Sequence, residues 1–500
     1  MHYNLKTLMV GGGCMIAATC ALCLAGTTDL RLIQAAKNND LESAGRLIKE
    51  RVDVNAPYGD GSTALAWAAY NDNLAIADLL IRSGANVNAA NEDGSAPLHL
   101  ACTNRSAAMV ERLVAAGADT NAKLLNGETA LMSCARAGEP KTVKALLAHG
   151  ADVNLKESAH NQTALMWAAA ERHPEVVGLL LQAGADFKAR SLEYPTTVVG
   201  EQTQKSGREK LNYTVIRGGM TPLLFAARSG DVESAKLLLA AGADANDVLP
   251  DGMSALVSAA HSGNGEVGAL LLENGANPNA DGIGYTALHA AVLRNDLPLV
   301  RTLLAKGANP NTRMTKGTPI RRSNTDYNLP NTLIGSTPYL LAAKFAEPEI
   351  MGALVSGGAD LNITLPGGAT ALMLAAGFGS ARNRRVIPLV EPAGLIFKTV
   401  EAAVTLGADV NAANEAGDTA LHLVATSGND SAVQFLVDHG AKVNVKNKRG
   451  QTPLTLALTA GGRAAAAAAD PDADITGVPA PGRGGHPTTV ALLRKLGATQ

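Results

Sequence analysis

The chain has few aromatic residues, few cysteines and no excess charge of either sign. Only 3% of its 500 residues are aromatic and only five are Cys, which excludes a small scaffold held together by many disulfides. The formal net charge is −2, from 43 basic and 45 acidic side chains, so we expect no nucleic-acid partner. Because 46% of the residues are hydrophobic and 18% are charged, the chain can bury a large core made mainly of small aliphatic side chains.

Motifs of the common enzyme classes are also missing. The sequence contains no G-x-x-x-x-G-K-S/T phosphate loop, no G-x-S-x-G nucleophile turn, no H-E-x-x-H zinc motif and no C-x-x-C-H haem-attachment motif. Many aspartates recur at regular intervals along the chain, and this spacing prevents them from converging on one metal ion. We therefore predict a protein that is not an enzyme, with no catalytic residue, no cofactor and no bound metal.

The first 26 residues have the pattern of an export signal. Lys6 supplies a positive charge, the run from Leu8 to Leu24 is uncharged and mostly apolar, and small residues follow at Ala25 and Gly26. We predict cleavage after Ala25 and hence an exported protein, periplasmic or secreted, without a membrane span after cleavage. An uncleaved anchor and an incidental apolar start are the alternatives, although the run is short for a membrane span.

Two cysteines lie outside this segment. Cys102 and Cys134 occupy small-residue positions of predicted helices, so we expect buried thiols that pack as alanine would. A disulfide between them would need Cα atoms within about 7 Å of each other. Neighbouring helices usually lie farther apart than that.

What the sequence has in abundance is a repeated pattern. A Thr-Ala-Leu or Thr-Pro-Leu signature, or a close variant, returns mostly every 32–34 residues, with three longer intervals of 49, 51 and 58 residues. A Gly lies 21 residues after most of these starts, as Gly84 does, and an Asp/Asn-x-Asn triplet usually follows. The signature begins at Thr63, Ala96, Thr129, Thr163, Thr221, Ser254, Thr286, Thr337, Thr370, Thr419 and Thr452.

Each part of the pattern has a physical role in a helix–turn–helix–loop unit. The opening Thr hydroxyl can cap a helix, and Pro at the next position suits the first helical turn. Paired alanines such as Ala68 and Ala69 allow close packing, and paired leucines such as Leu79 and Leu80 form the core of a second helix. Gly then ends that helix, and the Asp/Asn pair favours a turn. One unit cannot bury its apolar face alone, so the units must stack.

The 33-residue period and the Thr-Pro-Leu-His signature resemble the ankyrin repeat. The resemblance covers roughly residues 29–460 and 487–498. It implies an all-α solenoid of about 11–12 helix–turn–helix units with loop or β-hairpin fingers, in which His99, His289 and His422 bond within and between repeats. The segments are a signal peptide at 1–26, an N-terminal capping repeat at 27–60, repeats at 61–189, 220–313 and 336–450, and a C-terminal repeat at 451–500.

Four insertions interrupt the period. The insertions at 190–219 and 314–335 follow complete helix pairs, so we place them at the finger edge of the solenoid. The insertions at 378–398 and 461–486 fall between the two helices of their units, and the second is an Ala/Pro/Gly-rich linker. The first three together carry a net charge of +7. We therefore interpret the two finger insertions as basic contact surfaces, the alternative being ordinary solvated loops.

The resemblance also implies where a partner binds. In ankyrin proteins the contact residues lie just before the Thr-Pro-Leu-His start and seven to eight residues after it, on the concave face. We predict that residues 220–313, bracketed by the two finger insertions, form the main docking groove for an acidic or mixed protein surface. The predicted contact residues are Met220, Arg228, Met253, His261, Tyr285, Arg294, Lys344 and Phe345.

These observations favour a monomeric, non-catalytic scaffold for protein–protein interactions in the cell envelope or the secreted space. Two alternatives remain open. The basic insertions could make the chain a glycan- or polyanion-binding module. Alternatively, it could be an accessory subunit of a periplasmic redox enzyme, in which case the redox centre would belong to the partner because this chain lacks a haem-attachment motif.

Overall fold

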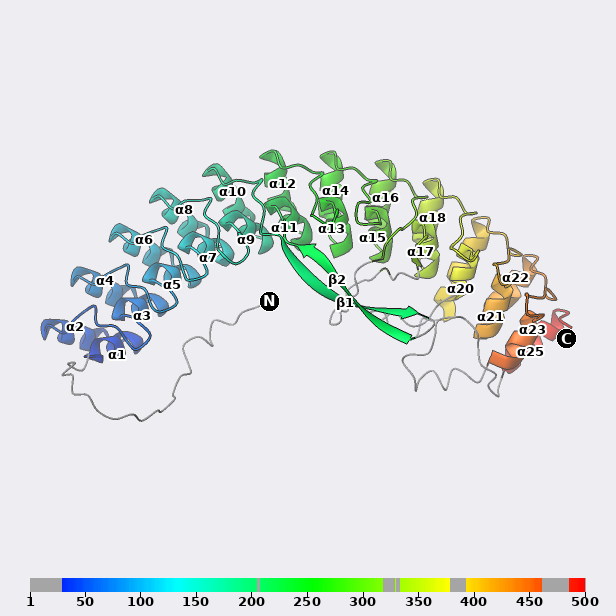
Figure 1. Ribbon diagram of the computed structural model, residues 1–500, viewed down its shortest axis with the longest axis horizontal. Coiled ribbons are helices and arrows are strands. Elements are labelled where there is room, and N and C mark those ends of the chain that lie inside the picture. Colours follow the sequence, from blue (N-terminus) through cyan, green and yellow to red (C-terminus); the bar gives the residue numbers. More distant parts are fainter. Residues whose placement is uncertain are drawn as a thin grey trace.

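The computed structural model describes residues 29–204, 207–317, 329, 333–377, 393–460 and 485–499. Over these residues the chain forms twelve helix pairs that stack side by side into an arc (Figure 1). The first helices of the pairs are α1 (Arg31–Lys37), α3 (Ala64–Tyr70), α5 (Pro97–Thr103), α7 (Ala130–Ala137), α9 (Ala164–Ala170), α11 (Pro222–Ser229), α13 (Ala255–Ser262), α15 (Ala287–Leu293), α17 (Pro338–Lys344), α19 (Ala371–Ala375), α21 (Ala420–Ser427) and α23 (Pro453–Thr459).

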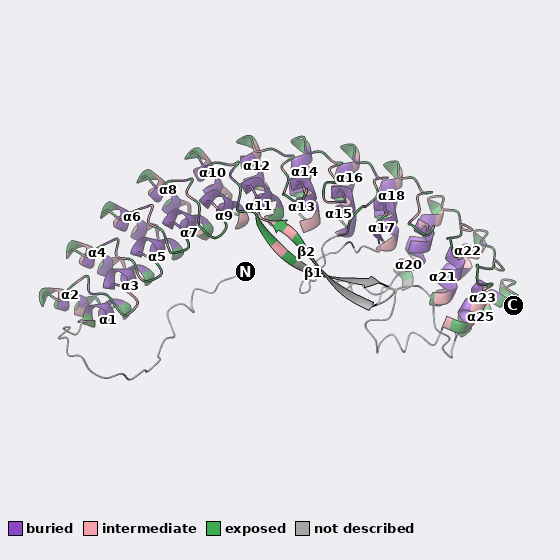
Figure 2. Ribbon diagram, in the orientation of Figure 1, coloured by how far each residue is buried: buried purple, intermediate pink, exposed green. Residues whose placement is uncertain are grey.

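The second helices form a separate outer row, so that the first helices line the concave side of the arc (Figure 1). They are α2 (Leu41–Lys49), α4 (Leu74–Arg82), α6 (Ala107–Ala115), α8 (Pro140–Ala148), α10 (Pro174–Gln182), α12 (Val232–Ala240), α14 (Gly265–Glu273), α16 (Leu297–Ala305), α18 (Pro348–Ser356), α20 (Ala393–Thr405), α22 (Asp430–Asp438) and α25 (Pro487–Lys495). The core lies between the rows and is continuous along the arc (Figure 2). The all-α solenoid predicted from the sequence is therefore confirmed.

The signature residues form the units in the predicted way. The Thr63 hydroxyl accepts a hydrogen bond from the Ala66 backbone N–H at 3.3 Å, which caps α3, and the same contact recurs at most other starts. Ala68 and Ala69 are fully buried and let α3 pack closely between its neighbours. Gly84 follows α4 with a φ of 87°, a left-handed conformation that costs an L side chain free energy.

The Asp/Asn-x-Asn triplet does more than turn the chain. Its first side chain accepts a bond from the backbone two residues on, as Asn277 does from the Asn279 N–H at 2.9 Å. Its last side chain bridges to the following repeat: the Asn279 amide donates to the Gly307 carbonyl at 2.9 Å and accepts from the Asn309 N–H at 2.7 Å. This bridge recurs at nine junctions. Each repeat is thereby held in register with the next.

Replacing Asn279 with Ala is expected to lower the free energy of unfolding by about 1 kcal/mol, because two exposed hydrogen bonds between repeats are lost. Urea denaturation followed by circular dichroism would measure the change. Asn362→Ala is the matched control, since Asn362 holds the same place in its triplet but forms no such bridge within the described part of the chain. Equal losses in the two variants would contradict the bridging role.

The structure contradicts the prediction of two free thiols. Cys102 of α5 and Cys134 of α7 form a disulfide, with their Cα atoms 4.6 Å apart. The helices approach this closely because small residues meet at their contact: Ala101 and Ala135, like both cysteines, are fully buried. Ordinary helix pairs lie too far apart for such a bond, whereas these alanine-rich first helices pack more tightly.

The insertion at 190–219 forms a long β-hairpin of β1 (Tyr194–Gln204) and β2 (Gly207–Arg217). The strands pair antiparallel from Tyr194 opposite Arg217 to Gln204 opposite Gly207. The hairpin follows α10, leaves the array beside α11 and projects into the hollow on the concave side of the arc (Figure 1). Its base is closed by backbone bonds between Ser191 and Met220 at 3.0 Å and between Gly219 and Ser191 at 3.2 Å.

An arginine fastens this base to the next unit. The Arg190 guanidinium donates to the Gly219 carbonyl at 2.7 Å and to the Val248 carbonyl at 3.1 Å, and it forms an ion pair with Asp247. The hairpin therefore begins from a fixed platform on the array.

The insertion at 314–335 has a similar base. The Met314 N–H donates to the Ser336 carbonyl at 2.8 Å, and the Gly335 N–H donates to the Met314 carbonyl at 2.7 Å. Leu329 and Leu333 of this insertion are buried.

Other predicted segments lie partly or wholly outside the described residues. This applies to the signal peptide, to residues 378–392 and to residues 461–484. Residues 393–398, which the sequence analysis assigned to the third insertion, form the first half of α20. Within the ranges that the structure describes, no helix combines the length and apolar character needed to cross a membrane.

Candidate functional site

The concave side carries cations stacked on aromatic rings. The Lys37 ammonium lies 4.8 Å from the centre of the Trp67 ring, the Arg136 guanidinium 4.6 Å from that of Trp167, and the Arg228 guanidinium 5.5 Å from that of Phe225. Such contacts are worth about 0.5–1 kcal/mol at exposed sites. They hold the long basic side chains in defined positions along the inner helix row.

The repeat register produces these pairs. Trp67, Trp167 and Phe225 each lie four residues after the threonine that caps their helix. Lys37 and Arg136 lie in the last turns of the first helices of the units before those of Trp67 and Trp167. Stacking therefore brings Lys37 and Arg136 over an aromatic ring of the next unit, whereas Arg228 and Phe225 lie three residues apart in the same helix α11.

Two histidines at the fourth position of the signature form hydrogen bonds within and between repeats. The Thr286 N–H donates to His289 Nδ1 at 3.2 Å, and His289 Nε2 lies 3.2 Å from the Ser336 carbonyl in the next unit. Since a carbonyl only accepts, the neutral Nε2–H tautomer satisfies both contacts. His422 makes equivalent contacts with Thr419 and Gln451, so the bonding implied by the ankyrin resemblance is confirmed at these two positions.

Burial keeps these rings neutral. Desolvation lowers the pKa of His289 to about 4, and it also lowers the pKa values of His422 and His99 below their ordinary value. They therefore stabilise the array as uncharged groups.

The structure removes two of the predicted contact residues from the surface. Tyr285 is 1% exposed and Met220 is 7% exposed. The Tyr285 ring packs against the His261 ring, with centroids 6.0 Å apart, and burial raises the pKa of its phenol far above the ordinary value. Met220 lies beneath the base of the hairpin, where its N–H donates to the Ser191 hydroxyl at 3.0 Å. At both residues, the position just before a unit start is therefore buried in the core and not exposed to a partner.

The other predicted contact residues keep some exposure. Arg228 is exposed at the end of α11, whereas His261 and Arg294 are half-buried. Arg294 Nε donates to the His261 carbonyl, so this side chain joins two neighbouring units. Met253, Lys344 and Phe345 are also half-buried. Arg228 is therefore the predicted residue best placed to meet a partner.

The tryptophans were not among the contact residues predicted from the sequence. Trp67 and Trp167 are the two Trp residues of the chain, and their rarity was a signal that they could carry a specific role. Their basic neighbours lie 30 and 31 positions earlier in the sequence, so only the stacking of units reveals the pairs. Among the residues that the structure describes, no group of three His, Cys, Asp or Glu side chains could hold a metal ion.

Comparison with known families agrees with this architecture. A model described as "Ankyrin repeats (3 copies)" matches residues 32–124, 107–191, 223–314 and 393–475, and one described as "Ankyrin repeats (many copies)" matches residues 165–239. No individual protein of curated function matches the chain. Ankyrin arrays are scaffolds for protein–protein interaction, and the matched segments span more than half of the sequence. The chain therefore belongs to the ankyrin repeat family.

Proposed function

We propose that this protein is an exported, monomeric and non-catalytic scaffold that binds a protein partner on its concave face between the insertions at 190–219 and 314–335. The observation that carries the proposal is the hairpin, which begins beside α11 and projects into the hollow of the arc that α11, α13 and α15 border (Figure 1). Partner residues in that space would meet both the hairpin and the ends of these helices. Arg228 at the end of α11 gives the face a preference for acidic groups.

The Cys102–Cys134 disulfide supports the proposed location. Disulfides persist in oxidising compartments and are rare in the cytosol. The pair is fully buried in the core between two units. Together with the apolar run at the N-terminus, it favours the cell envelope or the secreted space.

Cross-linking in the native cell, combined with fractionation of the same sample, tests the proposal. We expect the protein in an envelope or extracellular fraction, with an envelope protein cross-linked through residues 190–335. Recovery only from the cytoplasm with an intact N-terminus would overturn the proposed location. Recovery of a polyanion or glycan, with affinity that falls steeply with salt, would favour the alternative binding module.

Arg228→Ala is expected to weaken binding of the recovered partner about tenfold, because truncation of an arginine anchor commonly costs more than 1 kcal/mol. Arg228 is a cleaner choice than Arg294, whose side chain also joins two units. Lys236→Ala on the outer helix α12 is the matched control, since Lys236 is exposed and pairs with Glu233 of its own helix at 2.7 Å. Surface plasmon resonance would measure both variants, and unchanged affinity of Arg228→Ala would exclude this residue from the interface.

A further inference from the structure

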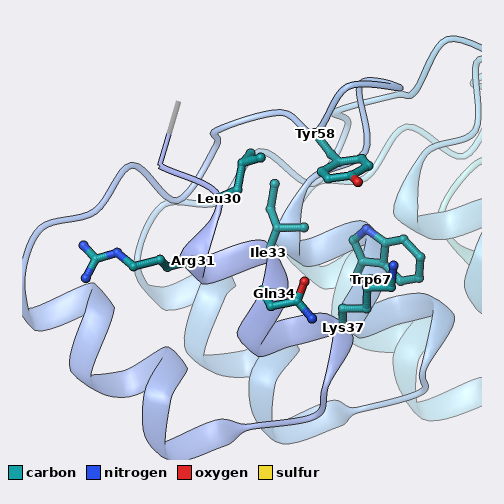
Figure 3. Close-up of a pocket in the computed structure, with 7 residues that line it drawn as sticks. All are labelled: Leu30, Arg31, Ile33, Gln34, Lys37, Tyr58 and Trp67. Atoms are coloured by element: carbon teal, nitrogen blue, oxygen red, sulfur yellow. The ribbon is translucent and has the colours of Figure 1, made fainter. Parts of the chain in front are cut away.

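A second feature of the concave side lies far from the proposed groove, at the N-terminal end of the array. Here α1, α3 and the loop that follows α2 enclose a cavity of about 310 Å³ (Figure 3). We call it the N-terminal pocket, and its lining consists of Leu30, Arg31, Ile33, Gln34, Lys37, Tyr58 and Trp67. None of these residues was predicted as a contact residue from the sequence.

The walls of the N-terminal pocket are largely apolar. Ile33 and Trp67 form its inner wall and are 3% and 8% exposed, whereas Leu30 and Tyr58 stand at its rim, 38% and 47% exposed. Together with the buried wall they form a continuous apolar surface that opens to solvent, the kind of patch that marks a binding site. In a chain with only 3% aromatic residues, two aromatic rings at one opening indicate a surface suited to binding.

The pocket also contains a hydrogen-bond donor that lacks an acceptor. Trp67 Nε1 is buried and donates to no atom of the described chain. Leaving such a donor unpaired destabilises a protein by about 1–3 kcal/mol. An acceptor carried by a bound molecule would therefore find a preformed site, with the indole ring already held in place beneath Lys37.

The charges around the opening favour an acidic ligand. Among the described residues that line the cavity none is acidic, whereas Arg31 and Lys37 are basic. Arg31 is already paired with Asp29 and Glu50, at 2.7 and 3.4 Å. The Lys37 ammonium lies instead over the Trp67 ring, so its charge is the one turned toward a ligand in the pocket.

We propose that the N-terminal pocket binds an extended segment of a protein partner, with an apolar or aromatic side chain in the cavity and a carboxylate beside it. The inserted side chain packs against Ile33 and the Tyr58 and Trp67 rings. A carbonyl or carboxylate oxygen accepts the Trp67 Nε1–H, and a neighbouring Asp or Glu of the segment lies near Lys37. The inference rests on the proposed scaffold function and adds a second contact point to it.

One spectroscopic probe reports on this pocket alone. In the full chain carrying Trp167→Phe, Trp67 supplies the single indole N–H signal in a ¹⁵N-labelled sample. The probe is the peptide Ac-Gly-Asp-Phe-Glu-Gly-NH2, and the reference peptides replace its Phe with Ala or both of its acidic residues with Lys. We expect the acidic Phe peptide to move the indole signal and both reference peptides to leave it unchanged.

Variants then test the two polar groups. With a fluorescein-labelled acidic Phe peptide, fluorescence anisotropy should show at least a fivefold loss of affinity for Lys37→Gln and for Trp67→Phe, which keeps a ring but removes the N–H donor. Arg136→Gln is the matched control, because it alters the equivalent cation–ring pair at Trp167, and it should bind normally. Circular dichroism would establish that all three variants are folded.

Several results would overturn the proposal. If the acidic peptide does not shift the indole signal, or if the lysine peptide shifts it equally, the pocket does not bind the proposed acidic segment. A shift produced instead by chitotetraose would make the pocket a glycan site. If deleting residues 1–28 moves the signal before any peptide is added, the leading segment of this chain is the occupant. The scaffold function itself is judged separately, by whether a partner is cross-linked through residues 190–335.

Discussion

Replacing Cys102 with Ala is expected to lower the free energy of unfolding by about 3–4 kcal/mol. The two cysteines are 32 residues apart, and closing a loop of that length removes about this much conformational entropy from the unfolded chain. Alanine fills nearly the same space in the α5–α7 contact, so the change isolates the cross-link from core packing. Denaturation under oxidising conditions would measure the loss.

Two controls separate the covalent bond from the packing of the thiols. The double variant Cys102→Ala with Cys134→Ala should be as unstable as the single variant, and the reductant that destabilises the wild type should have no effect on it. Hydrogen exchange should accelerate mainly in α5 and α7, because each unit of a repeat array depends chiefly on its neighbours. If both cysteines of the denatured protein can be alkylated without prior reduction, the Cys102–Cys134 disulfide does not form.

The regular part of the fold could be predicted from sequence because local signals recur. Thr63 as a cap, Gly84 as a helix end and the Asp/Asn-x-Asn turns each act within a few residues of their own position. Because these local signals repeat with one period along the chain, a stack of about twelve units could be predicted from them. The bond from Asn279 to the next repeat also depends on the distance between the stacked units. The turn could therefore be predicted from the sequence, but the bond between units could not.

The candidate site was less predictable, because its contacts join different units. The Lys37–Trp67 pair and the Cys102–Cys134 bond both depend on how closely two first helices approach. Tyr285 and Met220 were expected at the surface from their register, yet their neighbours cover them. A position in a repeat specifies where its Cα lies, whereas side-chain exposure depends on the size of the residues around it.

Acidification from pH 7 to pH 5 is expected to destabilise the array by about 2 kcal/mol through His289 alone. Its pKa is about 4 in the folded protein, compared with about 6.5 in an unfolded chain. The unfolded state therefore binds more protons, and the stabilisation is complete above about pH 6.5 and lost as the pH falls toward 4. The lowered pKa values of His99 and His422 act in the same direction.

Urea denaturation of wild type and His289→Gln at pH 7 and pH 5 would measure this effect. The variant should be less stable at pH 7, since it lacks the ring that fills a fully buried site between Thr286 and Ser336. Its loss of stability on acidification should be about 2 kcal/mol smaller than that of the wild type. His149→Gln is the matched control for the substitution itself, because His149 is exposed at the end of α8 instead of buried between two units. If the free energy of unfolding changes equally with pH in the wild type and in His289→Gln, then His289 does not resist protonation in the folded array.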